Sequence, residues 1–202
     1  MTSPNTREAI LAAASELYAD RGYDAVSMRD VAAAVSIQPA SLYHHFKDKD
    51  ALILAALEHV FSARAAPARD ILLEDRPPGK RLDAFIDWLV RLYFDDAAFA
   101  RLTIRGLLDG NDERKAYLAT TVIDSVFAPL SQLISELSAA VDPGLTAASI
   151  ISLIVGHSQV ASTFVHLPRK LRALGEADAL SAHIKGFVRR SLGLSNPSEA
   201  AP

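Results

Sequence analysis

Residues 27–52 read SMRDVAAAVSIQPASLYHHFKDKDAL, and this stretch predicts two short helices joined by a tight turn. Ser27 is a favourable N-cap, because its hydroxyl can accept a hydrogen bond from a backbone N–H one turn into the helix. Apolar residues then recur at helical spacing, which predicts one buried face. The members of that face are Met28, Val31, Ala32 and Val35.

The second helix of the stretch follows a turn at residues 35–37. Pro39 stands where a helix can begin, since the first helical position tolerates a missing N–H. Leu42 and Phe46 are predicted to face inward, and the donor-rich side chains outward, namely Ser41, Tyr43, His44 and His45. A short helix of this kind, supported on a preceding helix, is typical of a helix-turn-helix that enters the major groove of DNA.

The same residues closely resemble the amino-terminal domain of the tetracycline-repressor (TetR/AcrR) family. The resemblance is carried by the run from Ala9 to Tyr23, by residues 27–32 and 41–46, and by Lys49 with Leu52. It covers about the first quarter of the chain, and the remainder resembles the family only in its helical pattern.

Two positions depart from the family pattern. Ser36 stands where many members have glycine, so Ser36 either takes a left-handed conformation or the turn differs. Ala40 replaces another common glycine, and its methyl group could touch a thymine.

The resemblance and the exposed pattern together give a predicted DNA-binding surface. Tyr43, His45 and Lys49 resemble the phosphate-binding residues of the family, and Ser27 adds a neutral donor. Arg29 could reach a guanine edge with its two-pronged guanidinium. The full predicted set is Ser27, Met28, Arg29, Pro39, Ala40, Ser41, Tyr43, His44, His45 and Lys49.

Composition excludes several other classes of protein. The 202 residues are 50% apolar and include no cysteine, which excludes disulfides, thiolate catalysis and cysteine-based zinc fingers. The amino terminus lacks the basic start and apolar core of a secretory signal, so a cytoplasmic location is expected. The charge-free run 143–168 contains two histidines and several hydroxyl residues, which favours a buried helix of a soluble protein over a membrane span.

Net charge argues mildly against nonspecific DNA binding. Residues 1–60 contain five Lys and Arg against eight Asp and Glu, a net charge of −3. A protein that coats DNA without specificity should be basic. We therefore expect weak nonspecific affinity and specific binding by a dimer.

Helical periodicity continues to residue 192 and predicts an all-α chain of about nine helices. Beyond residue 48, the predicted helices are 48–67 (with a kink or break at Pro67), 80–94, 97–108, 113–141 (with a kink or division at Pro129), 145–167 and 178–192. The domains follow as a helix-turn-helix domain at 1–50, a helical ligand-binding and dimerisation domain at 51–193, and a disordered tail at 194–202.

Catalytic and metal-binding patterns are not found in the sequence. Residues 156–160, GHSQV, lack the second glycine and the preceding strand of a nucleophile elbow. His157 and His166 have no partner at metal-ligand spacing, and there is no glycine-rich phosphate loop. We expect no enzyme activity and no cofactor.

A ligand region is implied by the family resemblance, as an internal and largely apolar cavity in the middle helices. Its candidate residues are Trp88, Tyr93, Phe99, Tyr117, Phe127, His157 and Phe164, although aromatic residues at helical spacing are more often plain core. Arg105 is another candidate, but Arg101, Arg105 and Asp109 repeat at intervals of four, which is typical of a solvated face.

The last two predicted helices are candidates for self-association. The run 145–167 is apolar on several sides and must be covered on more than one of them. By resemblance, this pair packs against its twofold copy in a four-helix interface. The predicted interface residues are Leu153, Gly156, Val160, Thr163, Leu167, Leu180, Ile184, Phe187 and Val188.

These observations predict a ligand-responsive transcriptional regulator, a repressor that a small, largely apolar effector releases from a palindromic operator. It would bind double-stranded DNA as a homodimer, with no membrane partner. The alternative is a helical ligand-binding or interaction protein with weak or lost DNA binding, which the acidic first 60 residues and Ser36 faintly favour.

Overall fold

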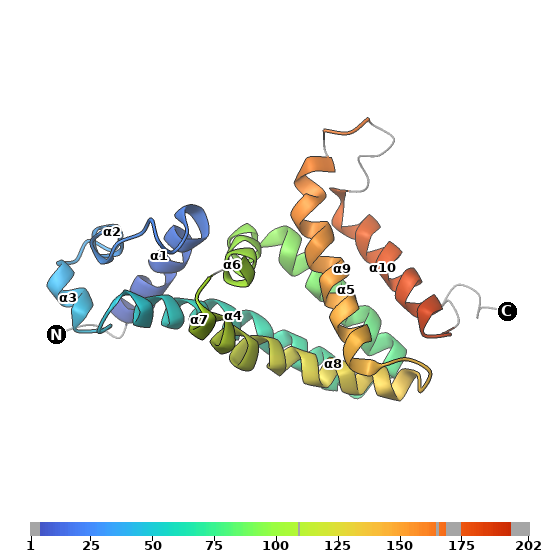
Figure 1. Ribbon diagram of the computed structural model, residues 1–202. Helices are drawn as coiled ribbons and strands as arrows, with labels where there is room; N and C mark the ends of the chain where they lie inside the picture. Colours follow the sequence, from blue (N-terminus) through green and yellow to red (C-terminus); the bar gives the residue numbers. More distant parts are fainter. Residues whose placement is uncertain (1–4, 109, 165, 169–174, 195–202) are drawn as a thin grey trace. The chain divides into compact units, whose positions relative to one another are not determined.

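The computed structural model describes residues 5–108, 110–164, 166–168 and 175–194, and these ranges contain helices without a strand. Ten α-helices and one π-helical turn follow one another within them, which confirms the predicted all-α class (Figure 1). The chain divides into two compact units, each built from two segments: Met1–Ala65 with Ala97–Ile123, and Ala66–Asp96 with Asp124–Pro202.

The first unit contains the predicted helix-turn-helix. Its elements are α1 (Asn5–Arg21), α2 (Met28–Ala34), α3 (Pro39–Tyr43), the beginning of α4 (Lys49–Leu73), α6 (Ala97–Leu108), α7 (Asp112–Leu118) and the π-helical turn η1 (Ala119–Ile123). Helix α1 packs against both α2 and α6, and its Ile10, Ala14 and Tyr18 are buried. The unit therefore joins the amino-terminal helices to α6 and α7, which come much later in the sequence.

The second unit is a bundle of α5 (Pro78–Asp95), α8 (Asp124–Leu137), α9 (Pro143–Phe164) and α10 (Ala177–Ser191), with the end of α4. Helix α5 contacts α8, α9 and α10, and its Leu82, Phe85 and Ile86 are fully buried. Burial of each such side chain contributes about 1.5–3 kcal/mol, so α5 supplies much of the core of this bundle.

Three ion pairs connect α5 with α10 in antiparallel order. Asp83 pairs with Arg189 at 3.1 Å, Asp87 with Lys185 at 2.7 Å, and Arg91 with Asp178 at 2.8 Å. Successive pairs are one turn apart on α5 and one or two turns apart on α10. The three pairs together fix which residues of α10 face α5.

Several predicted boundaries were wrong, and packing explains most of the differences. Helix α4 continues through Pro67 to Leu73, because the turn beyond the proline buries Ala68 and Leu72. The predicted helix 113–141 is divided at η1 rather than at Pro129, which lies inside α8, and it ends at Leu137. Of the predicted disordered tail, only Leu194 belongs to the described residues.

Helices α4 and α9 are long and apolar enough to cross a membrane, by length and composition alone. Both, however, take part in packed units: α9 buries Ala147, Ile150 and Ile154 and contacts α5, α8 and α10. The central helix of a soluble bundle has the same composition, so these two helices are weak evidence for a membrane protein.

Candidate DNA-binding surface and effector region

A reciprocal cap begins α2. The Ser27 hydroxyl accepts a hydrogen bond from the Asp30 N–H at 3.2 Å, and the Asp30 carboxylate accepts one from the Ser27 N–H at 2.7 Å. The Ser27 hydroxyl also donates to Asp30, and these two hydrogen bonds from Ser27 hold the pKa of Asp30 below its usual value. The predicted N-cap is confirmed.

Two predicted DNA contacts in α2 are placed differently by this cap. Ser27 uses both its N–H and its O–H on Asp30, so it has no donor left for a phosphate. Met28 is buried, with 7% of its surface exposed, because it belongs to the apolar face of α2. Arg29 is exposed beside them and is the residue of this turn that remains available to DNA.

The turn between α2 and α3 depends on a strained serine. Ser36 has φ of 56°, the left-handed conformation, and it is the only described non-glycine residue with positive φ. The N–H groups of Ser36 and Ile37 donate to the carbonyl oxygens of Ala33 and Ala32 at 3.1 and 3.0 Å, which closes the end of α2. Of the two predicted alternatives, the left-handed conformation is the one observed.

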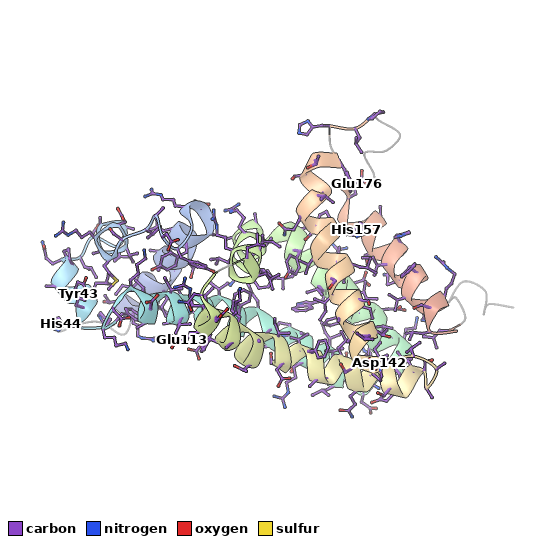
Figure 2. The ribbon with its side chains drawn as sticks, in the orientation of Figure 1. Tyr43, His44, Glu113, Asp142, His157 and Glu176 are labelled. Atoms are coloured by element: carbon purple, nitrogen blue, oxygen red, sulfur yellow. The ribbon has the colours of Figure 1, made fainter. Side chains whose placement is uncertain are left out.

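Helix α3 is only five residues long and begins with Pro39, as predicted. Leu42 is fully buried and fixes the helix to the unit, whereas Tyr43 is 54% exposed and His44 is also exposed. Figure 2 shows Tyr43 and His44 at the end of α3. Ala40 is exposed, and Pro39 and Ser41 are half-buried, so α3 presents a mixed polar and apolar surface.

Two residues predicted to bind phosphate, His45 and Lys49, make contacts within the protein. The His45 ring is half-buried, 6.4 Å from the Phe46 ring, and its Nε2 is buried with no hydrogen-bond partner among the described residues. Lys49 donates from Nζ to the carbonyl oxygen of Asp24 at 3.1 Å. His45 cannot use Nε2 on DNA in this arrangement, and Lys49 holds the loop before α2.

One basic residue near α3 was missed by the sequence analysis. The Arg7 guanidinium lies over the Phe46 ring, 5.3 Å from its centroid. This cation–π contact brings a positive charge from α1 beside the segment that follows α3. The spacing of residues along the sequence gives no signal for it, because Arg7 lies on α1 and Phe46 lies in the loop between α3 and α4.

Of the solvated face predicted for Arg101, Arg105 and Asp109, Arg101 is exposed as predicted, Arg105 is not, and Asp109 lies outside the described residues. Arg105 is half-buried and donates from Nε to the Ala19 carbonyl oxygen at 3.1 Å and from a terminal nitrogen to the Asp20 carbonyl oxygen at 3.0 Å. Arg101 pairs with the Asp20 carboxylate at 2.8 Å. Both arginines therefore bind the last turn of α1.

The predicted ligand residues are divided between the two units. Phe99 and Tyr117 belong to the first unit, where Phe99 is buried edge-on against Phe61 at 5.1 Å. The second unit holds Trp88, Tyr93, Phe127, His157 and Phe164. Tyr93 is buried, Trp88 lies 5.8 Å from Phe85, and Phe127 is half-buried, so these three are part of the helical packing.

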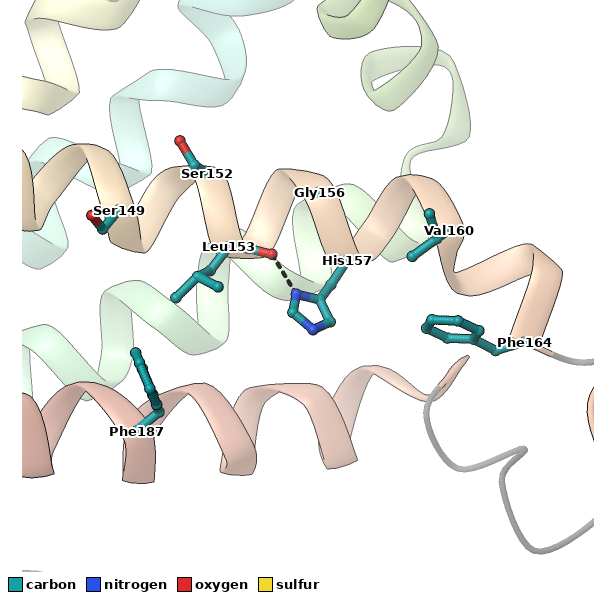
Figure 3. A pocket seen from close by; sticks show the side chains of 8 residues that line it. All are labelled: Ser149, Ser152, Leu153, Gly156, His157, Val160, Phe164 and Phe187. Atoms are coloured by element: carbon teal, nitrogen blue, oxygen red, sulfur yellow. Dashed lines mark hydrogen bonds between the residues drawn. The ribbon is translucent and has the colours of Figure 1, made fainter.

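An open apolar groove of about 680 Å³ runs along α9 and reaches α10 (Figure 3). It is lined by Ser149, Ser152, Leu153, Gly156, His157, Val160, Phe164 and Phe187. His157 Nδ1 lies 2.8 Å from the Leu153 carbonyl oxygen of its own helix. His157 and Phe164, predicted as ligand contacts, thus line the same open surface as the predicted interface residues.

Three of the predicted interface residues lie in the interior instead. Leu180, Ile184 and Val188 are buried within the second unit, because they form the face of α10 that packs on α5 and α9. Phe187 is exposed on the groove. On α9, Gly156, Val160 and Thr163 are exposed and Leu153 is half-buried; Leu167 is half-buried beyond the end of the helix.

Comparison with known proteins adds independent information. Residues 10–56 match the family model described as bacterial regulatory proteins, tetR family. The HTH-type transcriptional repressor BdcR of Escherichia coli K12 is 28% identical over 151 residues, which cover 69% of this chain and 77% of BdcR. The negative transcriptional regulator IcaR of the biofilm operon icaADBC in Staphylococcus epidermidis is 26% identical over 100 residues, 49% of this chain and 52% of IcaR.

Solved structures share the whole fold. FadR from Bacillus subtilis, in complex with stearoyl-CoA, aligns with a TM-score of 0.75 at 16% identity over 90% of this chain and 96% of FadR. A regulatory protein of the tetR family from Rhodococcus RHA1 aligns with a TM-score of 0.71 at 22% identity over 96% and 100%. Residues 10–56 are therefore similar to bacterial regulatory proteins of the tetR family, and the chain as a whole shares its fold with the solved structures.

Proposed function

We propose that this chain acts as a homodimeric repressor. The two copies of α3 dock onto a palindromic operator, and a small, largely apolar effector releases the protein from the DNA. The observation that carries the proposal is α3 itself, which is fixed by a fully buried Leu42 and exposes Tyr43 and His44. A rigidly held short helix with exposed hydrogen-bonding side chains is what entry into a major groove requires.

The roles on DNA follow from exposure and donor chemistry. Tyr43 can donate its hydroxyl to a phosphate, and Arg29 can make a two-pronged contact with guanine. Ala40 and His44 are exposed and are the proposed contacts to base edges, and Lys49 adds positive charge for the DNA backbone while it holds the loop at Asp24. This part of the chain, placed by the sequence at residues 1–50, stays the proposed DNA-binding domain.

The groove along α9 supports the proposed dimer. Val160 and Phe187 are large apolar side chains that are 44% and 48% exposed, next to Gly156, where the helix backbone is bare. An apolar strip of this kind is costly in water, and a twofold copy of α9 and α10 would cover it. Two recognition helices would then meet successive major grooves about 34 Å apart.

We also propose that an effector binds within residues 51–193, the ligand-binding domain predicted from the sequence. The FadR structure that shares this fold was solved with stearoyl-CoA, a ligand with a long apolar chain. We infer a ligand of mostly apolar character for this chain also, and release of DNA by population shift, in which the effector binds better to the form that fits DNA poorly. A cytoplasmic location follows from the same function.

The proposed function is tested by placing a charged residue in the apolar groove of α9 and measuring dimerisation and DNA binding. We expect Val160→Asp to shift the chain from dimer to monomer in analytical ultracentrifugation and to weaken operator binding in fluorescence anisotropy. Leu145→Asp is the matched control, since Leu145 is exposed on α9 outside the groove. A monomeric wild-type chain, or a dimeric Val160→Asp variant with full affinity, would contradict the dimer.

A second measurement tests whether an effector releases the protein from DNA. Operator DNA and effector should each reduce the affinity for the other by the same factor, because linkage between two sites is reciprocal. A chain that binds a small apolar molecule tightly but never binds the DNA beside its own gene would support the alternative, a ligand-binding protein that has lost DNA binding.

A further inference from the structure

A second pocket, distinct from the groove on α9, lies within the first unit. It measures about 600 Å³, a size typical of small-molecule sites, and it is formed by the end of α1, the loop to α2, and helices α6 and α7. Its lining includes four arginines: Arg21, Arg101, Arg105 and Arg114. Only seven arginines occur in the described part of this unit, so more than half of them converge on one depression.

The four guanidinium groups come from three helices, and three of them are held in place by contacts within the unit. Arg101 is held by the Asp20 carboxylate and Arg105 by the backbone at the end of α1. Arg114 pairs with Asp50 at 2.9 Å and lies over the Tyr23 ring, 5.4 Å from its centroid. Arginines that are already oriented lose little conformational freedom when they bind a further anion.

Arg21 is the exception among the four. It lines the same pocket without a hydrogen bond or ion pair to a described residue, and its charge helps to lower the pKa of the Asp30 carboxyl. The N–H donors of Arg21 are therefore available at the pocket.

One side of the pocket is apolar. Tyr23, Ile104 and Leu108 belong to the lining, and Leu108 is 80% exposed. Guanidinium groups bind phosphate oxygens with two parallel hydrogen bonds, and an apolar body attached to the phosphate would cover the exposed leucine.

We propose that this pocket binds a small phosphorylated molecule, whose phosphate Arg21 holds together with the arginines of α6 and whose apolar part contacts Ile104 and Leu108. The site would be separate from the effector region proposed above. A ligand here would bridge α1 and α6, so it would stiffen the connection between the helix-turn-helix and α6.

The test is isothermal titration calorimetry on the full chain in a low-salt chloride buffer, with inorganic phosphate and phenyl phosphate as probes and without DNA. We expect one saturable site per chain and tighter binding of phenyl phosphate than of inorganic phosphate. Arg21→Gln should weaken binding at least tenfold without change in thermal midpoint, because Arg21 makes no internal bond. Arg69→Gln, an exposed arginine of α4 in the other unit, should bind like wild type.

Three outcomes would overturn the proposal: no saturable binding, equal affinity of Arg21→Gln and wild type, or equal losses in Arg21→Gln and Arg69→Gln. Loss of DNA affinity in Arg21→Gln without any anion site would assign the cluster to the DNA backbone and would also overturn it. Because the titration contains no DNA, its result does not depend on whether the proposed operator mechanism is correct.

Discussion

Arg105 on α6 donates from its Nε to the carbonyl oxygen of Ala19, 3.1 Å away, at the end of α1. The last carbonyl groups of a helix have no partner within it, and a positive charge there also interacts favourably with the helix dipole. Arg105 satisfies two of these carbonyls, so α6 completes a helix that lies more than 80 residues earlier in the sequence.

Replacing Arg105 should therefore destabilise the first unit. We expect Arg105→Met, which keeps most of the stem, to lower the free energy of unfolding by about 1.5–3 kcal/mol in urea denaturation, because two charge-assisted hydrogen bonds are lost. Arg101→Gln is the control and should cost less than about 1 kcal/mol, since its ion pair is exposed. Equal effects of the two variants would refute the capping role.

Gly22 makes room for that arginine. Its φ is +85°, and a Cβ at this position would lie 2.8 Å from a terminal nitrogen of Arg105. We expect Gly22→Ala to be more destabilising than Gly193→Ala, whose φ is +70° but which has nothing within 4 Å. The Gly193 variant should lose only the backbone term, about 1 kcal/mol. Comparing the thermal unfolding of the two variants separates the cost of the left-handed backbone from the cost of the close approach to Arg105.

Ser36 carries a cost that glycine would remove. A left-handed conformation costs a side-chain-bearing residue roughly 1–2 kcal/mol, so Ser36→Gly should raise the free energy of unfolding by about 1 kcal/mol. Ala33→Gly, at an exposed position inside α2, should lower it by a similar amount. Opposite signs in urea denaturation are the expected result, and the same sign for both variants would contradict it.

Asp87 makes the bundle sensitive to acid. Burial opposes its ionisation, but hydrogen bonds from Lys185 and Ser181 outweigh that effect, and the net pKa of Asp87 lies below its ordinary value of 3.8. A carboxyl with a depressed pKa stabilises the fold above the unfolded-state pKa, and this contribution disappears as the pH falls through the folded-state pKa. The stability gap between wild type and Asp87→Asn should thus be full near pH 6 and shrink below about pH 4.

The control for this pH dependence is Asp178→Asn, which removes an exposed ion pair from the same two helices. Its free energy of unfolding should stay within about 1 kcal/mol of wild type, because exposed ion pairs contribute little. Urea denaturation between pH 3 and 7 measures both variants, and a gap for Asp87→Asn that does not vary with pH would contradict the assignment.

On DNA, Arg29 and Tyr43 should behave differently. Arg29→Ala should reduce preference at one base pair by about 1–3 kcal/mol, because a two-pronged contact to guanine is lost. Tyr43→Phe should weaken binding to every sequence alike, because a phosphate contact carries no sequence information. Fluorescence anisotropy with operator and scrambled DNA measures both, and equal losses on the two DNAs would refute the role of Arg29.

The local pattern was enough to predict the helix-turn-helix. The cap at Ser27, the turn at Ser36 and the start of α3 at Pro39 all depend on residues close in sequence, and all three are observed. Helix boundaries were less well predicted where packing opposes local preference, as at Pro67, which α4 passes through because Leu72 beyond it is buried.

Side-chain partners across the fold were not predictable from spacing. Arg105 shows the interval of a solvated face, yet it is half-buried and binds the end of α1, and Arg7 on α1 contacts Phe46 in the loop after α3. Leu180 and Phe187 both lie on the apolar side of α10, and only the packing of α5 and α9 decides that one is buried and the other exposed. Such choices depend on neighbours that the sequence pattern does not reveal.

The brevity of α3 has a genetic consequence. A helix of five residues does not persist by itself in water, so the shape proposed to meet an operator depends on the packing of the buried Leu42 side chain. A selection for mutants that fail to silence a reporter gene should therefore recover interior substitutions such as Leu42→Ala alongside changes at Arg29 or Tyr43. Only a measurement of how much folded protein accumulates in the cell would tell the two groups apart.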